Sequence, residues 1–247
     1  MTQALSPRDR LIVALDLGAG VSVDVARSLE GRVRWLKVGM TLFYQEGPQV
    51  VTRLRDLGFE VFLDLKLHDI PHQVRGAARA AAALGVQMLT VHAAGGSTMV
   101  TAAVAGAHEG ARESGLKPPA ILAVTVLTSM SDEELAAVGV QRPAVEQVPL
   151  LAGIARQGGA DGVVCSPGEA SIVRELLGED ALVVTPGVRP EWAAPEDQSR
   201  IATPAAALKA GASHLVVGRP ITTAPVPADA VERIVAEMEG AIEWPNR

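Results

Sequence analysis

A run of charged residues with regular spacing is the strongest chemical signal in this sequence. Asp64, Lys66 and Asp69 lie within the segment Asp64–Pro71, directly after a run of apolar residues. Side chains alternate between the two faces of a strand, so Asp64 and Lys66 are predicted to point the same way. Lys37, which has an aliphatic neighbour on each side, is turned inward by the same rule. Two lysines and two aspartates are therefore expected to converge, and such a cluster can hold preorganised charge against a reacting anion.

A purely structural ion-pair network is the alternative interpretation of these charges. Desolvation offsets most of the attraction between buried ions, so such networks are seldom kept for stability. Asp16 ends the first apolar run of the chain and adds a further charge to the set. The combination favours a functional site.

Two glycine-containing segments near the C-terminus predict a phosphate site. They are Pro186–Arg189 and the pair Gly218 and Arg219, each following an apolar run. In α/β barrels the loops after the last two strands commonly bind phosphate. Either arginine alone could be a surface residue beside a turn glycine. Together at these two places they favour an anionic ligand, which Arg219 could clamp with two hydrogen bonds.

The elements that must position these residues are eight short apolar runs, several almost continuous in aliphatic residues. Such runs are typical of strands buried on both faces. Segments of helical period lie between them, at Gln49–Leu57, Val74–Leu84, Ser97–Ser114 and Ala228–Glu239. The predicted strands are Leu11–Leu15, Trp35–Val38, Val61–Leu65, Val86–Val91, Ala120–Val126, Gly162–Cys165, Leu182–Val184 and His214–Val217.

Repeated alternation of strand and helix predicts an α/β fold with parallel strands. Eight strands in 247 residues favour a (β/α)₈ TIM barrel, a single catalytic domain over residues 1–247. A doubly wound open sheet is the main rival, but no G-x-G-x-x-G follows the first strand to suggest dinucleotide binding. The charged and glycine-rich residues collect where the predicted strands end, which is where barrels carry their active sites.

Composition narrows the range of partners and locations. The formal charge of −6 argues against nucleic acid or an anionic membrane as partner. The run Leu11–Leu15 is too short for a signal-peptide core or a membrane span. A single cysteine, Cys165, rules out an intrachain disulfide, and we expect a cytoplasmic protein.

The sequence resembles the orotidine 5′-phosphate decarboxylase family nearly from end to end. The Asp-x-Lys-x-x-Asp element is shared with sister families, but the full set of motifs is highly specific. The matching motifs are Ala14–Asp16, Lys37–Gly39, Asp64–Pro71, Val91–Ala93, Leu127–Ser129, Thr185–Arg189, Asp197–Gln198 and Val217–Ile221.

The resemblance implies a homodimeric decarboxylase that uses no cofactor and no metal and forms uridine monophosphate in pyrimidine biosynthesis. Lys66 would donate a proton to C6 of the pyrimidine, and Asp64 would lie against the departing carboxylate. Lys37 would hold the network and touch the ribose, while Asp69 and the adjacent Ile70 would reach into the partner's site. The other implied contacts are Asp16 to the ribose hydroxyls, Thr128 to the pyrimidine edge, and Gln198, Arg189 and Arg219 to the phosphate region.

One departure from the family pattern lies in the shared part of the site. The family usually reads Asp-Ile-Pro-Asn-Thr, with the threonine contacting the neighbouring subunit's ligand. The last two positions here are His72 and Gln73. Gln73 can still donate and accept hydrogen bonds, so we expect it to bind substrate through a longer side chain.

Three other functions are compatible with parts of this pattern. A Mg²⁺-dependent sugar-phosphate decarboxylase or aldolase resembles this chain in the third strand, where it shares Asp-x-Lys-x-x-Asp. Such enzymes carry an acidic metal ligand at the position of Lys37, and a lysine there repels a divalent cation. A Schiff-base aldolase would need Lys66 as a nucleophile, whereas flanking aspartates favour the ammonium form. A non-catalytic phosphate-binding barrel would not require all four charged residues.

Overall fold

Eight parallel strands close into a barrel in the computed structural model, which describes residues 5–193 and 202–240. Consecutive strands are neighbours around the barrel, and β1 pairs with β8 to close it. This confirms the predicted closed barrel and excludes the alternative of a doubly wound open sheet. The strands are β1 (Leu11–Ala14), β2 (Trp35–Gly39), β3 (Glu60–Leu67), β4 (Met88–His92), β5 (Ala120–Val124), β6 (Gly162–Val164), β7 (Leu182–Thr185) and β8 (His214–Val217).

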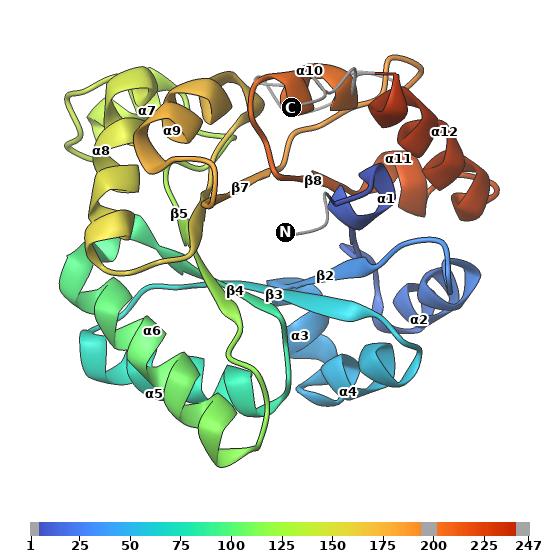
Figure 1. The fold of residues 1–247 in the computed structure, drawn as a ribbon, viewed down its shortest axis with the longest axis horizontal. Coiled ribbons are helices and arrows are strands. Elements are labelled where there is room, and N and C mark those ends of the chain that lie inside the picture. The colour runs from blue at the N-terminus through green and yellow to red at the C-terminus, as the bar shows by residue number, and fades with distance from the viewer. Residues whose placement is uncertain (1–4, 194–201, 241–247) are drawn as a thin grey trace.

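Helices surround the strands as an outer ring (Figure 1). All four expected helices are present, and the one after β3 begins earlier than expected because Pro71 occupies its first turn. The described α-helices are α1 (Pro7–Arg10), α2 (Ala19–Ser28), α3 (Met40–Glu46), α4 (Gln49–Asp56), α5 (Pro71–Ala83), α6 (Gly96–Glu113), α7 (Asp132–Ala137), α8 (Ala144–Gln157), α9 (Ala170–Leu177), α10 (Pro204–Lys209), α11 (Arg219–Thr222) and α12 (Pro227–Glu239). None of these helices is both long and apolar enough to cross a membrane.

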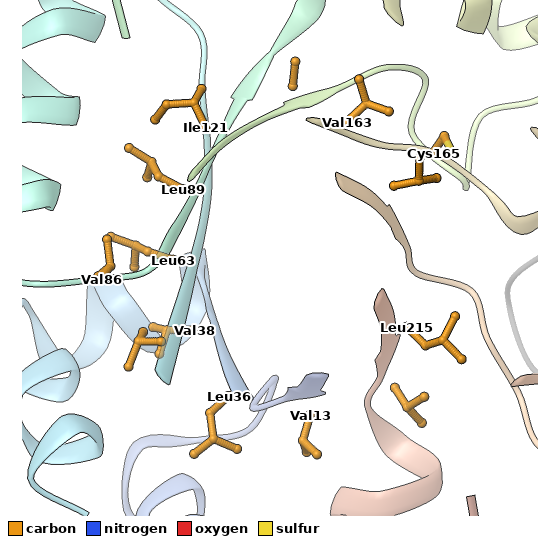
Figure 2. Close-up of a cluster of buried hydrophobic side chains, with 14 of the residues drawn as sticks. Val13, Leu36, Val38, Leu63, Val86, Leu89, Ile121, Val163, Cys165 and Leu215 are labelled. Atoms are coloured by element: carbon orange, nitrogen blue, oxygen red, sulfur yellow. The ribbon is translucent and has the colours of Figure 1, made fainter. Parts of the chain in front are cut away.

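The core has two layers because side chains alternate along each strand. One set points outward against the helices, as Figure 2 shows for Leu36, Val38 and Leu63. The other set fills the barrel interior and includes Phe62 and Met88. The outward direction of Leu36 and Val38 confirms the predicted inward direction of the residue between them.

A buried histidine makes the barrel interior sensitive to acid. The His214 side chain on β8 is buried, and its ring lies edge-on to Trp35 with centroids 5.8 Å apart. Burial, with help from Arg10 and Arg34, lowers the pKa of His214 to about 4. The unfolded chain therefore takes up a proton below about pH 6.5, while the folded chain does so only near the lower value, so stability is lost across this window.

We expect His214→Leu to weaken this pH dependence. Between pH 7 and pH 5 the wild-type protein should lose about 2 kcal/mol more free energy of unfolding than the variant. Urea unfolding at both pH values, at one fixed protein concentration, measures the difference. Equal losses in the two proteins would mean that His214 does not stay neutral in the folded state.

Candidate functional site

A cavity of about 520 Å³ opens at the carboxyl ends of the strands. Residues at the ends of β1, β2 and β3 line it, together with residues of the loops after β5, β7 and β8. Inward side chains of the strands, such as Phe62 and Val124, form its apolar floor. The cavity therefore lies where the sequence pattern predicted the active site.

Four charged side chains meet in this cavity. The Lys66 ammonium lies 2.8 Å from each carboxylate oxygen of Asp64. The Lys37 ammonium lies 3.4 Å from Asp64 Oδ2 and donates a hydrogen bond of 2.9 Å to Asp16 Oδ1. Two positive and two negative groups thus form a continuous array, with Asp16 as the second acid where the sequence had predicted Asp69.

Burial differs sharply along this array. Lys37 and Asp64 are buried, the Lys66 side chain is 26% exposed, and the Asp16 side chain is 61% exposed. Burial alone would raise the pKa of Asp64, but Lys37 and Lys66 outweigh it and hold that pKa below its ordinary value. Burial alone would lower the pKa of Lys37, but Asp64 and Asp16 outweigh it and raise that pKa. The buried pair is therefore charged at neutral pH.

The local backbone is shaped to allow these contacts. Gly39 follows Lys37 at the end of β2, and a Cβ atom there would lie 2.9 Å from Asp16 Oδ1 and 3.2 Å from Lys37 Nζ. Any side chain at this position would therefore press on the Lys37–Asp16 hydrogen bond. Lys66 itself has a φ of 51°, in the left-handed region that non-glycine residues seldom adopt.

The predicted phosphate residues belong to the same cavity. Pro186, Arg189, Gly218 and Arg219 all line it, with Arg189 buried and Arg219 exposed. Thr128 lies on the rim after β5. These positively charged residues and the lysine–aspartate array thus line one and the same cavity.

Three predicted residues do not line the cavity of their own chain. Asp69, Ile70 and Gln73 lie on the β3–α5 loop and the first turn of α5, and all three are exposed. The Asp69 carboxylate accepts a hydrogen bond from the backbone of Ile70. Within one chain, therefore, Asp69 does not join the array. Gln198 lies outside the described residues.

Two features in and beside the cavity were not anticipated from the sequence. Thr90, which is fully buried on β4, hydrogen-bonds both the Lys66 backbone and the Asp64 carboxylate. It stands at an inward position of β4, between the aliphatic residues Leu89 and Val91, and that parity was a usable signal. Cys165 lines the cavity itself, but burial raises the pKa of its thiol, which therefore stays protonated and unreactive.

The residues available as metal ligands are few in this region. Across residues 5–193 and 202–240, no group of three or more His, Cys, Asp or Glu side chains is placed to hold a metal ion. At the array itself the two acids already contact two lysines. The donor set does not suit a divalent cation, which the nearby ammonium groups would repel.

Comparison with known proteins agrees with this geometry. The model of the orotidine 5′-phosphate decarboxylase / HUMPS family matches residues 9–234. The chain is similar to the orotidine 5′-phosphate decarboxylase of Halorhodospira halophila, with 53% identity over 94% of this chain and 97% of the relative. That of Parasynechococcus marenigrum is 48% identical over 97% of this chain and 98% of the relative. The crystal structure of the orotidine 5′-phosphate decarboxylase from Lactobacillus acidophilus superposes with a TM-score of 0.82 at 44% identity, covering 93% and 99% of the two chains.

Proposed function

This chain belongs to the orotidine 5′-phosphate decarboxylase family and converts orotidine 5′-monophosphate to uridine 5′-monophosphate in pyrimidine biosynthesis, and from that premise we propose that Lys66 is its proton donor. The observation that carries the assignment of roles is the array of Lys37, Asp64 and Lys66 in a cavity that Arg189 and Arg219 also line. The reaction needs no cofactor in this proposal.

The chemistry explains why an ammonium group is needed. Cleavage of the bond between C6 and the carboxylate leaves the electron pair on C6 and releases CO₂. The resulting carbanion is localised, so a positive charge fixed beside C6 lowers the barrier more than one that must reorganise. The Lys66 ammonium, held by both oxygens of Asp64, supplies that charge and then transfers its proton to C6. Water restores the proton on Lys66 after product release.

Asp64 acts on the substrate carboxylate before it leaves. Two negative charges about 4 Å apart repel by roughly 4 kcal/mol at an effective dielectric of about 20. Departure of neutral CO₂ removes this repulsion, so it contributes only to the extent that binding energy elsewhere holds the carboxylate in place. Lys66 therefore carries more of the catalysis than Asp64 in this mechanism.

The rest of the cavity supplies that binding energy. Arg189 and Arg219, with the backbone at Pro186 and Gly218, bind the phosphate in this proposal, and Gln198 joins them. Asp16 and Lys37 bind the ribose hydroxyls, and Thr128 binds the pyrimidine edge. The arginines favour an anion, and they line the same cavity as the array, which suits a ligand that carries both a phosphate and the reacting carbon.

We also propose that two copies of the chain share each active site. The support is the exposure of Asp69, Ile70 and Gln73 on one loop and helix start, away from their own cavity. In a two-fold dimer each loop would reach the partner's cavity, so every site would hold Lys66 of one chain and Asp69 of the other. In this proposal residues 1–247 are one catalytic domain, and the enzyme works in the cytoplasm, where its single cysteine would stay reduced.

The decisive experiment is decarboxylation of orotidine 5′-monophosphate during exhaustive chelation. Activity should be unchanged by EDTA, because Lys37 stands beside Asp64 where a metal-dependent relative would need another acid. Loss of absorbance by the substrate measures turnover, with and without added Mg²⁺. Activity that disappears on chelation and returns with Mg²⁺ would favour the metal-dependent sister enzymes, and absence of all turnover would favour a binding protein.

A further inference from the structure

A single buried hydroxyl connects the two central residues of the array. Thr90 on β4 is fully buried, and its Oγ1 atom accepts a hydrogen bond of 2.8 Å from the Lys66 backbone N–H. The same hydroxyl donates a hydrogen bond of 3.0 Å to Asp64 Oδ1. A threonine hydroxyl has one donor hydrogen and two acceptor positions, so both bonds form at once.

The backbone of β3 makes this hydroxyl necessary. Regular pairing of β3 with β4 stops after Leu63 and resumes at Leu67, whose partner Val91 is only two residues beyond Leu89. The chain between these points bulges out of the ladder, and Lys66 takes its left-handed φ there. A buried N–H removed from the ladder costs free energy unless another acceptor replaces the lost carbonyl. The Thr90 hydroxyl is that acceptor for Lys66.

The bulge also sets the direction of the lysine side chain. Asp64 and Lys66 both face the cavity, and Lys66 Nζ contacts both Asp64 oxygens. Thr90 fixes the backbone of one member of this pair and the side chain of the other. Its position on the strand therefore controls their relative placement, which is the geometry that proton transfer to a substrate carbon demands.

We propose that Thr90 is a positioning residue for decarboxylation, whose hydroxyl holds Lys66 and Asp64 in their reactive arrangement. This inference rests on the proposed role of Lys66. Thr90 does not line the cavity and does not touch substrate in this proposal. Loss of its hydroxyl should therefore change kcat and leave KM for orotidine 5′-monophosphate nearly constant.

The test compares Thr90→Val, which keeps the shape without the hydroxyl, with a matched control. Thr125→Val also removes a buried threonine hydroxyl. That hydroxyl donates a hydrogen bond of 2.9 Å to the Val164 carbonyl and is not the partner of Asp64 or Lys66. We expect kcat of Thr90→Val to fall by about ten- to a hundredfold, since hydrogen bonds to charged and buried groups are lost, with KM within about threefold. Thr125→Val should keep the wild-type kcat.

A second pair separates the hydroxyl from packing. Thr90→Ser and Thr90→Ala remove the same methyl group and differ only in the hydroxyl, so the serine variant should recover most of kcat and the alanine variant should not. The acid limb of the kcat profile should also move to higher pH in Thr90→Val, because the Asp64 carboxylate loses a hydrogen-bond donor. This pair decides the question even if the valine variant folds poorly.

One kinetic result and one structural result would each overturn the proposal. If Thr90→Val and Thr90→Ala keep the wild-type kcat and pH profile, the hydroxyl does not position the pair. If the wild-type enzyme itself fails to turn over the substrate, the proposed function fails, and a crystal structure of Thr90→Val then decides the positioning role alone. Lys66 should leave its left-handed conformation and its contact with both Asp64 oxygens in that structure. An unchanged arrangement would contradict the inference.

Discussion

Replacement of Lys66 by alanine should lower kcat for orotidine 5′-monophosphate by more than about a thousandfold, because it deletes both the charge beside the carbanion and the proton source. The Lys66 ammonium faces the cavity and is held by both oxygens of Asp64. The other lysine of the array, Lys37, is buried between Asp16 and Asp64 and is fixed in a different place. Steady-state and single-turnover kinetics measure the loss directly.

Lys66→Arg separates the two roles of this side chain. An arginine keeps a positive charge but does not release its proton at ordinary pH, so the variant should also be nearly inactive. Lys209→Ala, which removes an exposed lysine from α10, controls for the general loss of a positive charge. If Lys66→Ala kept kcat within about tenfold of wild type, or roughly 1.4 kcal/mol of barrier, Lys66 would not be the proton donor.

A mixture of two inactive variants should regain activity. Lys66→Ala and Asp69→Ala are unfolded or dissociated together and then allowed to re-form dimers. In a mixed dimer one site receives both changes and the other receives none, because Asp69 comes from the partner in the proposed arrangement. With random pairing half of the dimers are mixed, so about a quarter of all sites should be wild type. Activity should rise toward that fraction of the wild-type value.

The control for this recovery is a mixture in which both changes affect the same half of the site. Lys66→Ala mixed with Asp64→Ala should stay inactive if Lys66 and Asp64 act from one chain, as their contact within the chain requires. Native mass spectrometry of tagged subunits establishes that mixed dimers have formed. If mixed dimers of Lys66→Ala and Asp69→Ala form and remain inactive, Asp69 acts within its own chain.

The strands and their inward residues could be predicted because buried parallel strands have a simple pattern. All eight apolar runs are strands, and the predicted His214–Val217 run matches β8 at both ends. The alternation of side chains along β2 correctly predicted that Lys37 points toward the cavity. Asp64 and Lys66 also share a face, as predicted, although the path of the backbone between them differs from a regular strand.

The parts that escaped prediction depend on contacts between elements. The bulge in β3 arises from its pairing with β4, and no local pattern of residue types in Asp64–Leu67 predicts it. Thr90 gains its importance only from that bulge. The expected convergence of Asp69 with the lysines was wrong within one chain, because the β3–α5 loop turns the aspartate to the surface. Short helices such as α3 and α10 offer too few turns for an apolar period to stand out.

Because of the left-handed backbone at Lys66, selection for folding and selection for catalytic activity favour different residues at this position. A non-glycine residue held in this region costs about 1 kcal/mol or more, and glycine would avoid that cost. In a library of variants sorted for folding yield alone, the backbone conformation at this position would therefore favour replacement of the lysine by glycine. A library sorted for growth without added pyrimidines would keep it. Efforts to make this enzyme more heat-resistant must select for turnover at every round, because at residue 66 the backbone conformation and the activity favour different amino acids.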